Sequence, residues 1–147
     1  MIVRKANIDT DGAWILHIRN NEQVFQYFNN NTKVEFDTHI TWLAKYLKND
    51  QNLFLVWEED WVIACYARKD SLWNNKFEIS IAVDPLFQGR WFAKRLLEEM
   101  VSLLKKWELL IAEIHKWNLS SQKLFERVWF TKYNEDPEKI YMHYFGE

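Results

Sequence analysis

The sequence predicts an α/β fold, with one mixed central β-sheet and helices on both of its faces. Residues 77–83 alternate between apolar and polar side chains, which is the period of a strand. Residues 93–106 instead repeat their apolar side chains at the spacing of an amphipathic helix. Further segments of both kinds follow one another along the chain, an order that is typical of helices packed on a sheet.

Seven segments are expected to be the strands of this sheet. They are short, and most are rich in β-branched or aromatic residues, which favour a pleated, half-buried backbone. They are residues 1–6, 52–57, 62–68, 77–83, 109–114, 130–133 and 140–145. Residues 58–61 separate the second segment from the third, so we expect these two to form a hairpin.

Helices are expected between the strands, where apolar residues recur at helical spacing. They include residues 14–18, 40–47, 93–106 and 124–128, with a shorter helical segment near Val24. The candidate N-cap residues are Asp9 or Asp11 for the first helix, Asp37 for the second and Asn118 or Ser120 for the last. Side chains of these types accept hydrogen bonds from the free N–H groups of a first helical turn.

The composition is that of one globular domain. The chain has 147 residues, of which 48% are apolar and 27% charged, so we expect a single domain over residues 1–147. No run of about 18 apolar residues occurs and the N-terminus builds no signal-peptide core, so we expect a cytoplasmic protein without a membrane partner. The formal net charge of −2, with both signs interspersed, argues against nucleic acid as a partner.

The cysteine and histidine residues indicate neither a redox site nor a metal site. Cys65 is alone and lies in an apolar stretch, so we expect a buried, unreactive thiol. The 4 histidines, His17, His39, His115 and His143, are far apart in the sequence and have no second ligand at metal-binding spacing. We therefore expect no metal site.

The connection between the strand at residues 77–83 and the helix at residues 93–106 is a candidate anion site. A helix N-terminus presents unpaired N–H groups and the positive end of the helix dipole, so a diphosphate would fit there. An ordinary strand-to-helix connection is the alternative interpretation.

Two segments match the sequence patterns of a known superfamily. Residues 79–85, followed by Gln88-Gly89-Arg90-Trp91-Phe92-Ala93, resemble the acetyl-CoA-binding motif of the GNAT N-acetyltransferases, whose loop reads Gln/Arg-x-x-Gly-x-Gly/Ala. Ala112-Glu113-Ile114 and Asn118-x-x-Ser121-x-x-x-Phe125-Glu126-x-x-Trp129-Phe130 resemble the Asn-containing loop, final helix and Gly-Phe ending of that superfamily. With weaker matches nearer the N-terminus, the resemblance covers nearly the whole chain.

The resemblance implies the GNAT fold, acetyl-CoA as cosubstrate and direct acetyl transfer to a primary amine. Pantetheine would then lie along residues 81–83 like an added strand, with the pyrophosphate on the N–H groups of residues 89–94. The cofactor-binding residues implied in this way are Ile81, Ala82, Val83, Gln88, Gly89, Arg90, Trp91, Phe92, Ala93, Lys94, Asn118, Ser121 and Phe125.

Direct transfer requires a base for the amine and favours a proton donor for the leaving thiolate. Glu78 is the candidate base, acting through a water molecule, and a solvated strand residue is the alternative. Many members of the superfamily have Tyr where this chain has Phe125, which donates no proton, so Tyr133, Tyr141 or water would take that role. Asn118 would bind pantetheine, or it would only cap the last helix.

The acceptor side rests on a match in the N-terminal half. Ile18-Arg19-Asn20 and His39-x-x-Trp42-Leu43 resemble GNAT members that acetylate the 4-amino group of a UDP-linked sugar in pseudaminic acid synthesis. Arg19 and Asn20 would hold polar groups, while His39 and Trp42 would offer a platform to a sugar or uracil. Alternatively, Trp42 is a core residue and His39 its surface neighbour.

Other acceptors and a different class of function stay open. The amine is alternatively a protein N-terminus, as in ribosomal-protein acetyltransferases, or a small molecule. A third possibility is a CoA-binding domain with little turnover. A homodimer is compatible with the sequence.

The chain has 9 Trp and only 3 Gly, whereas average usage predicts roughly 10 Gly. Several Trp residues occupy apparent turns or positions where the superfamily has Gly: Trp61, Trp73, Trp91, Trp107, Trp117 and Trp129. One hypothesis is that these positions descend from Gly, through UGA codons translated as Trp but read as Gly in the source organism. True divergence is the alternative, in which Trp91 fills or caps the cofactor groove.

Overall fold

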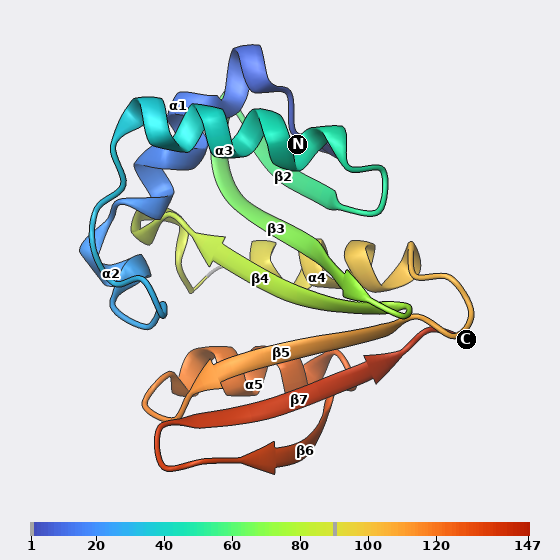
Figure 1. Ribbon diagram of the computed structural model, residues 1–147. Coiled ribbons are helices and arrows are strands. Elements are labelled where there is room, and N and C mark those ends of the chain that lie inside the picture. Colours follow the sequence, from blue (N-terminus) through green and yellow to red (C-terminus); the bar gives the residue numbers. More distant parts are fainter. Residues whose placement is uncertain (1, 90) are drawn as a thin grey trace.

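The structure is a computed structural model that describes residues 2–89 and 91–147. In this part of the chain the strands are β1 (Ile2–Lys5), β2 (Leu53–Glu59), β3 (Val62–Trp73), β4 (Lys76–Val83), β5 (Leu109–His115), β6 (Thr131–Glu135) and β7 (Lys139–Phe145). They form one sheet in the order β1-β2-β3-β4-β5-β7-β6 (Figure 1). β4 and β5 are parallel and the other neighbouring strands are antiparallel, so the predicted mixed sheet is confirmed.

Helices cover both faces of this sheet, which confirms the predicted α/β class (Figure 1). They are α1 (Ile8–Arg19), α2 (Glu22–Phe25), α3 (Phe36–Lys48), α4 (Phe92–Ser102) and α5 (Leu119–Arg127), with a short 3₁₀ helix, η1, at Pro85–Phe87. α1 and α3 contribute Ile18 and Leu43 to one buried cluster. α4 and α5 contribute Met100 and Phe125 to a second cluster on the other side of the sheet.

Strand β4 contributes to both clusters. Phe77 and Ile79 belong to the cluster beneath α4, whereas Ala82 belongs to the cluster beneath α1 and α3. The predicted alternation is therefore confirmed, and Glu78 and Ser80 lie on the face of β4 that points away from α4. Both Glu78 and Ser80 line a cavity on this face.

The start of two helices differs from the prediction. Asn7, and neither Asp9 nor Asp11, caps α1, since its Oδ1 accepts a hydrogen bond from the N–H of Asp9 at 2.8 Å. Glu35 precedes α3 without a side-chain cap, so Asp37 lies inside the first turn. The predicted caps were wrong because carboxylates are favourable both at the cap and in the first turn, and the sequence does not distinguish the two positions.

The end of α4 also differs from the prediction. The helix ends at Ser102, before the expected Lys106. Leu104 nevertheless stays buried in the cluster beneath α4. The apolar pattern therefore continues past the last helical turn, and periodicity alone overestimates the length of the helix.

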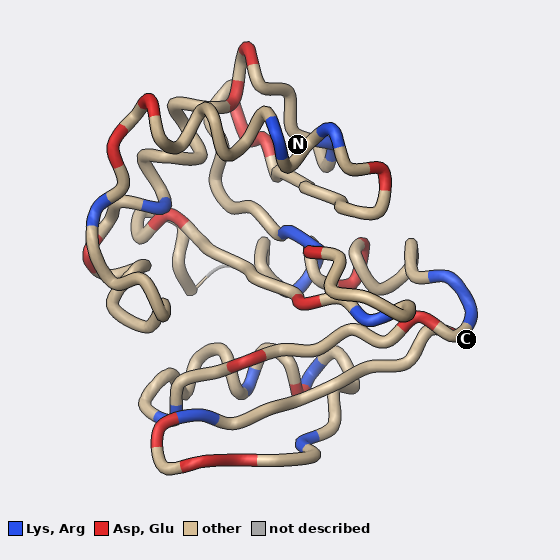
Figure 2. Tube along the Cα trace, viewed as in Figure 1, with Lys and Arg blue, Asp and Glu red and all other residues tan. Residues whose placement is uncertain are grey.

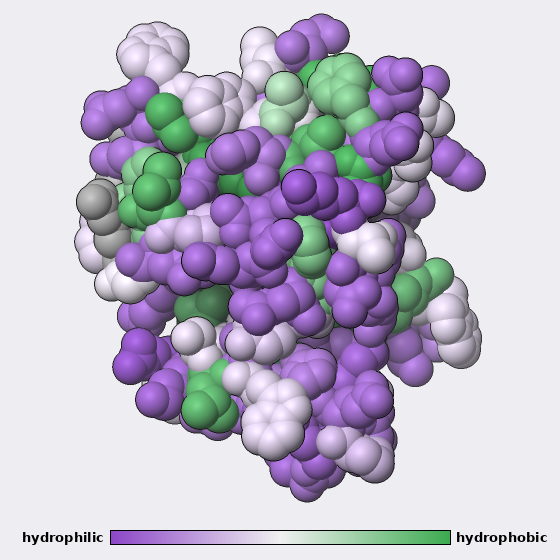
Figure 3. All heavy atoms as spheres, turned by 90° about the vertical axis from the view of Figure 1, so that its left-hand side faces the viewer, coloured by the Kyte–Doolittle hydropathy of each residue, from purple (hydrophilic) through white to green (hydrophobic). Residues whose placement is uncertain are grey.

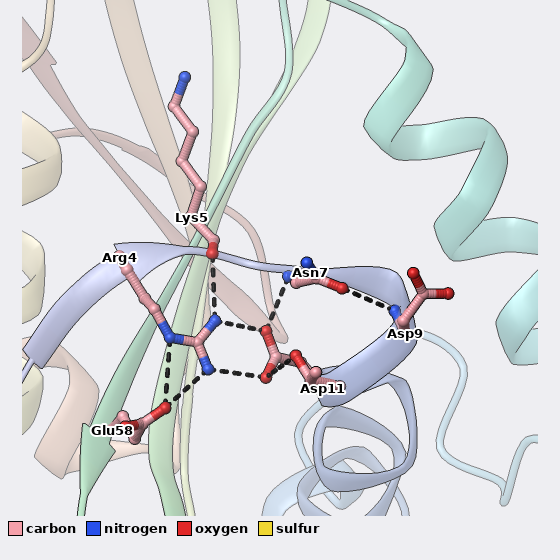
Figure 4. Close-up of polar contacts among 7 residues, drawn as sticks. Arg4, Lys5, Asn7, Asp9, Asp11 and Glu58 are labelled. Carbon is pink, nitrogen blue, oxygen red and sulfur yellow. Dashed lines mark hydrogen bonds and ion pairs between the residues drawn. The ribbon is translucent and has the colours of Figure 1, made fainter.

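A charged network fastens the N-terminal strand to its neighbours (Figure 4). Arg4 on β1 donates hydrogen bonds from Nη1 and Nη2 to the two carboxylate oxygens of Asp11 at 2.6 and 2.8 Å. Nη2 of Arg4 also bonds Glu58 on β2 at 2.8 Å, and Asp11 accepts a further bond from the N–H of Asn7. Burial alone would raise the pKa of Asp11, but the bonds from Arg4 and Asn7 outweigh it and lower that pKa.

Replacing Arg4 should destabilise the fold in a pH-dependent way. The pKa of Asp11 is lower in the folded chain, so its contribution is present above the unfolded value of about 3.9 and is lost as the pH falls through the folded value. Arg4→Met should therefore lower the free energy of unfolding by about 2 kcal/mol at pH 7. In urea titrations the difference from the parent should shrink at acid pH. An equal difference at neutral and strongly acid pH would contradict the assignment.

Three Trp residues adopt the left-handed backbone conformation that favours Gly. They are Trp61 (φ 68°), Trp107 (φ 75°) and Trp129 (φ 71°), and their side chains are 87%, 74% and 83% exposed. Trp73, Trp91 and Trp117 are not among the described residues with positive φ. Conformation therefore supports the Gly hypothesis at three of its six positions.

Two of these Trp residues lie in tight turns. Asp60 and Trp61 both have positive φ at the tip of the β2–β3 hairpin, where Asp-Gly is the favoured pair. Trp107 is the third residue of a turn closed by the hydrogen bond from the N–H of Glu108 to the carbonyl oxygen of Lys105, at 3.1 Å. A positive φ at that position alone is the pattern of a type II turn, which requires Gly or Asn.

Trp129 terminates α5 in a Schellman motif. Its N–H donates to the carbonyl oxygen of Glu126 at 3.1 Å, and the N–H of Phe130 donates to that of Phe125 at 3.0 Å. The rings of Phe125 and Phe130 also meet, with centroids 4.9 Å apart. Gly is the residue most often found at the left-handed position of this motif.

Replacing these Trp residues by Gly should stabilise the protein. A side chain in the left-handed region costs about 1–2 kcal/mol, and the exposed indoles recover little of that cost by burial. Trp61→Gly, Trp107→Gly and Trp129→Gly should each raise the free energy of unfolding by about 1 kcal/mol in urea titrations. Trp73→Gly is the matched control at an exposed position without positive φ, and it should give no gain.

A failure of all three variants to gain stability would show that the fold accommodates the indoles. The gene sequence tests the codon hypothesis separately, because UGG codons at these positions would rule out recoding.

Candidate active site

A cavity opens where β4 and β5 separate. The two strands pair only over residues 76–78 and 109–111, although both continue beyond this point. The cavity has a volume of about 1240 Å³ and is lined from both halves of the chain. On the face that carries the open ends of the strands, apolar side chains appear in a recess between largely hydrophilic parts (Figure 3).

Lys, Arg, Asp and Glu are distributed along the whole chain (Figure 2).

One part of the cavity lies between β4, the start of α4 and α5. Most of the residues expected to hold the cofactor line it: Ile81, Ala82, Val83, Gln88, Gly89, Trp91, Ala93, Lys94, Asn118, Ser121 and Phe125. Phe92 is instead 4% exposed and packs into the core against Trp57. Arg90 lies outside the described residues. Most of the residues expected to bind the cofactor thus line the same cavity, and Phe92 packs in the core.

The start of α4 has the features of an anion site. Trp91 is its N-cap residue and gives no side-chain cap, and the first turn carries no acidic residue. Gly89 precedes it with a φ of 78°, a conformation that other residues adopt at a cost. Lys94 lines the cavity one turn further on. The start of a helix, its dipole and a lysine together favour a diphosphate.

The indole of Trp91 packs beside this helix start. Its ring centroid lies 5.4 Å from that of Trp57 and 5.4 Å from that of Phe92. The Arg95 guanidinium lies 5.9 Å from the same ring. Trp91 is thus held at the edge of the cavity, and it remains 53% exposed.

Asn118 caps α5, as one of the two interpretations predicted. Its Oδ1 accepts a hydrogen bond from the N–H of Ser121 at 3.2 Å. The residue also lines the cavity. Capping uses only the amide oxygen, so its amide N–H groups stay available to a ligand.

Glu78 lies at the point where β4 and β5 separate, and it lines the cavity. Its side chain is half-buried and has no hydrogen bond or ion pair with any of the described residues. Burial raises the pKa of Glu78, and the charges of Glu113 and Asp70 raise it further against the opposing effect of Arg68 and Lys139. An unpartnered carboxylate with a raised pKa is a candidate proton acceptor.

Glu113 is a charged residue of the cavity to which the sequence assigned no role. It lies on β5, and its Oε1 accepts a hydrogen bond from Nζ of Lys139 at 3.0 Å. Lys139 also bonds the side-chain oxygen of Asn29, which lies in the connection between α2 and α3. A charged residue in an otherwise apolar strand could have indicated a functional site. Its neighbours, however, depend on the pairing of β5 with β4 and β7, which the sequence does not show.

Neither of the two tyrosines considered as proton donors is among the residues that line the cavity. Tyr133, on the edge strand β6, is 48% exposed and stacks on His143 with centroids 4.6 Å apart. Tyr141 donates a hydrogen bond to Asp136 at 2.7 Å, and this bond raises the pKa of Tyr141 to about 12. Neither lines the cavity, so the structure does not bring them together with Glu78.

Three of the four residues expected to bind the acceptor, Arg19, His39 and Trp42, line the cavity. Asn20 does not, because its amide bonds the carbonyl oxygen and the N–H of Val34, each at 2.8 Å. Arg19 donates to the carbonyl oxygens of residues 30 and 32, at 2.7 and 3.2 Å. Arg19 and Asn20 therefore fix the α2–α3 connection beside the cavity.

The alternative interpretation placed Trp42 in the core and His39 at the surface, but the structure shows the reverse. His39 is 4% exposed, and its Nε2 donates a hydrogen bond to the carbonyl oxygen of Gly12 at 3.1 Å. Burial lowers the pKa of His39, so the ring is neutral at pH 7. Trp42 is 37% exposed, with the Arg68 guanidinium 4.9 Å from its ring. A neutral imidazole and an accessible indole thus lie side by side, with centroids 5.9 Å apart.

Other chemistries have little support in the described part of the chain. Within residues 2–89 and 91–147, no group of three His, Cys, Asp or Glu side chains is arranged to hold a metal ion. Cys65 is buried as predicted, and burial raises the pKa of its thiol to about 12. None of the helices in the described residues is both long and apolar enough to cross a membrane.

Comparison with known proteins agrees with this geometry. Residues 17–130 match the model of the acetyltransferase (GNAT) family. A ribosomal protein bS18-alanine N-acetyltransferase from Haemophilus ducreyi is 30% identical over 115 residues, which are 74% of this chain and 79% of that protein.

Solved structures share the fold at lower sequence identity. The yncA protein of Salmonella typhimurium, solved with acetyl-CoA, has a TM-score of 0.88 at 22% identity, covering 100% of this chain and 94% of that one. A ribosomal-protein-alanine N-acetyltransferase from Brucella melitensis has a TM-score of 0.85 at 20% identity, covering 99% of both chains. Together with the family match over most of its length, these findings show that the chain belongs to the acetyltransferase (GNAT) family.

Proposed function

We propose that this protein transfers the acetyl group of acetyl-CoA to a primary amine, with Glu78 as the base. The observation that carries the proposal is the unpartnered, half-buried carboxylate of Glu78 at the opening between β4 and β5. A protonated amine would bind there and lose its proton to Glu78, directly or through a water molecule. The raised pKa of Glu78 brings its proton affinity closer to that of the amine.

The cofactor side of the cavity fits acetyl-CoA. Within the described part of the chain, residues 79–83 of β4 have no strand partner on the β5 side, so their backbone groups are free to pair with the amides of pantetheine. The start of α4, with Lys94, would hold the diphosphate. Asn118 would contribute its amide N–H groups. When bound, acetyl-CoA supplies the acetyl group as a thioester.

The acceptor that we propose first is a nucleotide-linked amino sugar. Arg19 has no carboxylate partner among the described residues and uses two of its five N–H donors on backbone carbonyls. Its remaining donors suit a phosphate, while Trp42 and His39 would form the platform for a ring. Glu78 would receive the amine at the other end of such a molecule.

A protein N-terminus is the second candidate acceptor. It is favoured by the Haemophilus ducreyi relative, whose name gives the alanine of a ribosomal protein as its acceptor. A backbone amine needs the same base and the same oxyanion stabilisation, so the arrangement at Glu78 does not separate the two candidates.

An acceptor screen separates these possibilities. Release of free thiol from acetyl-CoA would be measured with a UDP-linked 4-amino sugar, an Ala-terminated peptide, spermidine and no acceptor. Turnover with the amino sugar above all others supports the first acceptor, and turnover with the peptide supports the second. Absence of turnover with every amine, despite acetyl-CoA binding, would indicate a CoA-binding domain and overturn the proposed reaction.

Glu78→Gln should lower kcat about 100-fold or more at pH 7, because the amide no longer accepts the proton. The residue is a base only when ionised, so kcat/KM of the parent should fall as the pH drops through the raised pKa of Glu78. The variant should lack this acid limb. Acetyl-CoA affinity, measured by calorimetry, should stay close to that of the parent, and Glu126→Gln on exposed α5 is the matched control. Equal turnover in variant and parent would remove Glu78 from the mechanism.

Changes on the acceptor side should affect only the acceptor. Arg19→Ala removes the free donors, and His39→Gln keeps an N–H for the carbonyl of Gly12 while it removes the ring. Each should raise the KM of the acceptor about tenfold, since each deletes one polar or stacking contact. The KM of acetyl-CoA should change little. An effect confined to acetyl-CoA would contradict this division of the cavity.

A further inference from the structure

Three carboxylates follow one another across the sheet beside the acceptor part of the cavity. Asp70 on β3 is paired in register with Glu78 on β4, and Glu113 lies on the adjacent strand β5. Their charges act on one another, since both Asp70 and Glu113 raise the pKa of Glu78. The acceptor part would therefore be strongly acidic if these groups had no counter-ions.

Two of the three carboxylates have a cation of their own. Arg68 lies 3.7 Å from Asp70, and Nζ of Lys139 lies 3.0 Å from Glu113. The Lys139 and Glu113 side chains are only 21% and 27% exposed, so solvent screens this pair less than a surface pair. Glu78 is left as the carboxylate without a partner among the described residues that line the cavity.

Lys139 holds its place through a second contact. Its ammonium also bonds the side-chain oxygen of Asn29, and one strand away the ring of His115 meets that of Tyr27 at 5.8 Å. The α2–α3 connection thus touches β5 and β7 across the opening of the sheet. Lys139 is restrained from both sides, which keeps its charge beside Glu113.

We propose that Lys139 determines acceptor specificity by neutralising Glu113, so that the cavity accepts molecules with a single ammonium group. This inference rests on the proposed acetyl transfer to an amine. With Lys139 in place, an acceptor finds one uncompensated carboxylate, Glu78. Without it, Glu78 and Glu113 face the same cavity from neighbouring strands and together attract a dication.

The test compares two ligands that have the same carbon chain but differ in charge. Cadaverine carries two ammonium groups, and aminopentanol carries one ammonium and one hydroxyl group. Their affinities for the CoA-saturated protein would be measured by calorimetry at pH 7. The ratio of the two affinities isolates the contribution of the second charge.

Lys139→Met should raise the preference for cadaverine over aminopentanol about tenfold relative to the parent, because it uncovers a second carboxylate. Lys139→Arg keeps the charge and should keep the parental ratio. Asn29→Ala breaks only the contact with the α2–α3 connection, so it should also keep that ratio. Adding Glu113→Gln to Lys139→Met should cancel the gain. Lys132→Met, which removes an exposed lysine of β6, is the surface control.

The outcomes separate this inference from the proposed function. If Lys139→Met binds cadaverine no better relative to aminopentanol, or does not bind it at all, the specificity role is overturned. If Asn29→Ala shifts the ratio as much as Lys139→Met, loosening of the connection and not charge is responsible, and the role is again overturned. These are binding measurements, so they stand even if the acceptor screen finds no turnover, a result that would overturn only the proposed reaction.

Discussion

The separation of β4 from β5 is the constraint on which the rest of the site depends. Each strand remains paired on its outer side, β4 with β3 and β5 with β7, so both keep their direction after they part. Their inner edges then carry backbone N–H and C=O groups that need partners. A cavity open to water and to an extended ligand satisfies those groups, whereas a closed core would leave them unpaired. The same separation of the strands places Glu78 of β4 and Glu113 of β5 in the lining of one cavity.

The charges around this cavity explain why the carboxylate of Glu78 differs from those of its neighbours. A buried or half-buried charge is tolerated when a counter-ion or a hydrogen bond accompanies it. Asp70 and Glu113 have such partners in Arg68 and Lys139, but Glu78 has only its exposure to the cavity. Its carboxylate therefore keeps a raised proton affinity. Functional groups are expected where a local rule is broken in this way.

Local patterns predicted the elements of the fold, and long-range pairing decided what the sequence missed. Residues 77–83 and Asn118 were placed correctly because alternation and capping are local signals. Tyr133 was considered as a proton donor, but it does not line the cavity, because β7 lies between β5 and the edge strand β6. The pair of Lys139 with Glu113 was missed for the same reason, since the two residues meet only through the pairing of β5 with β7.

The Trp residues with positive φ are unusual both in the sequence and in their backbone conformation. Asp60, Asn74 and Asn75 adopt the same conformation, which short polar side chains tolerate. Trp61, Trp107 and Trp129 have large side chains that tolerate this conformation poorly. Their exposed indoles also gain little from packing that would offset the strain. Trp91 differs, because its φ is −80° and its ring packs on Trp57. Backbone conformation thus separates three Trp positions that favour Gly from Trp91 at the cavity edge, where an indole is accommodated.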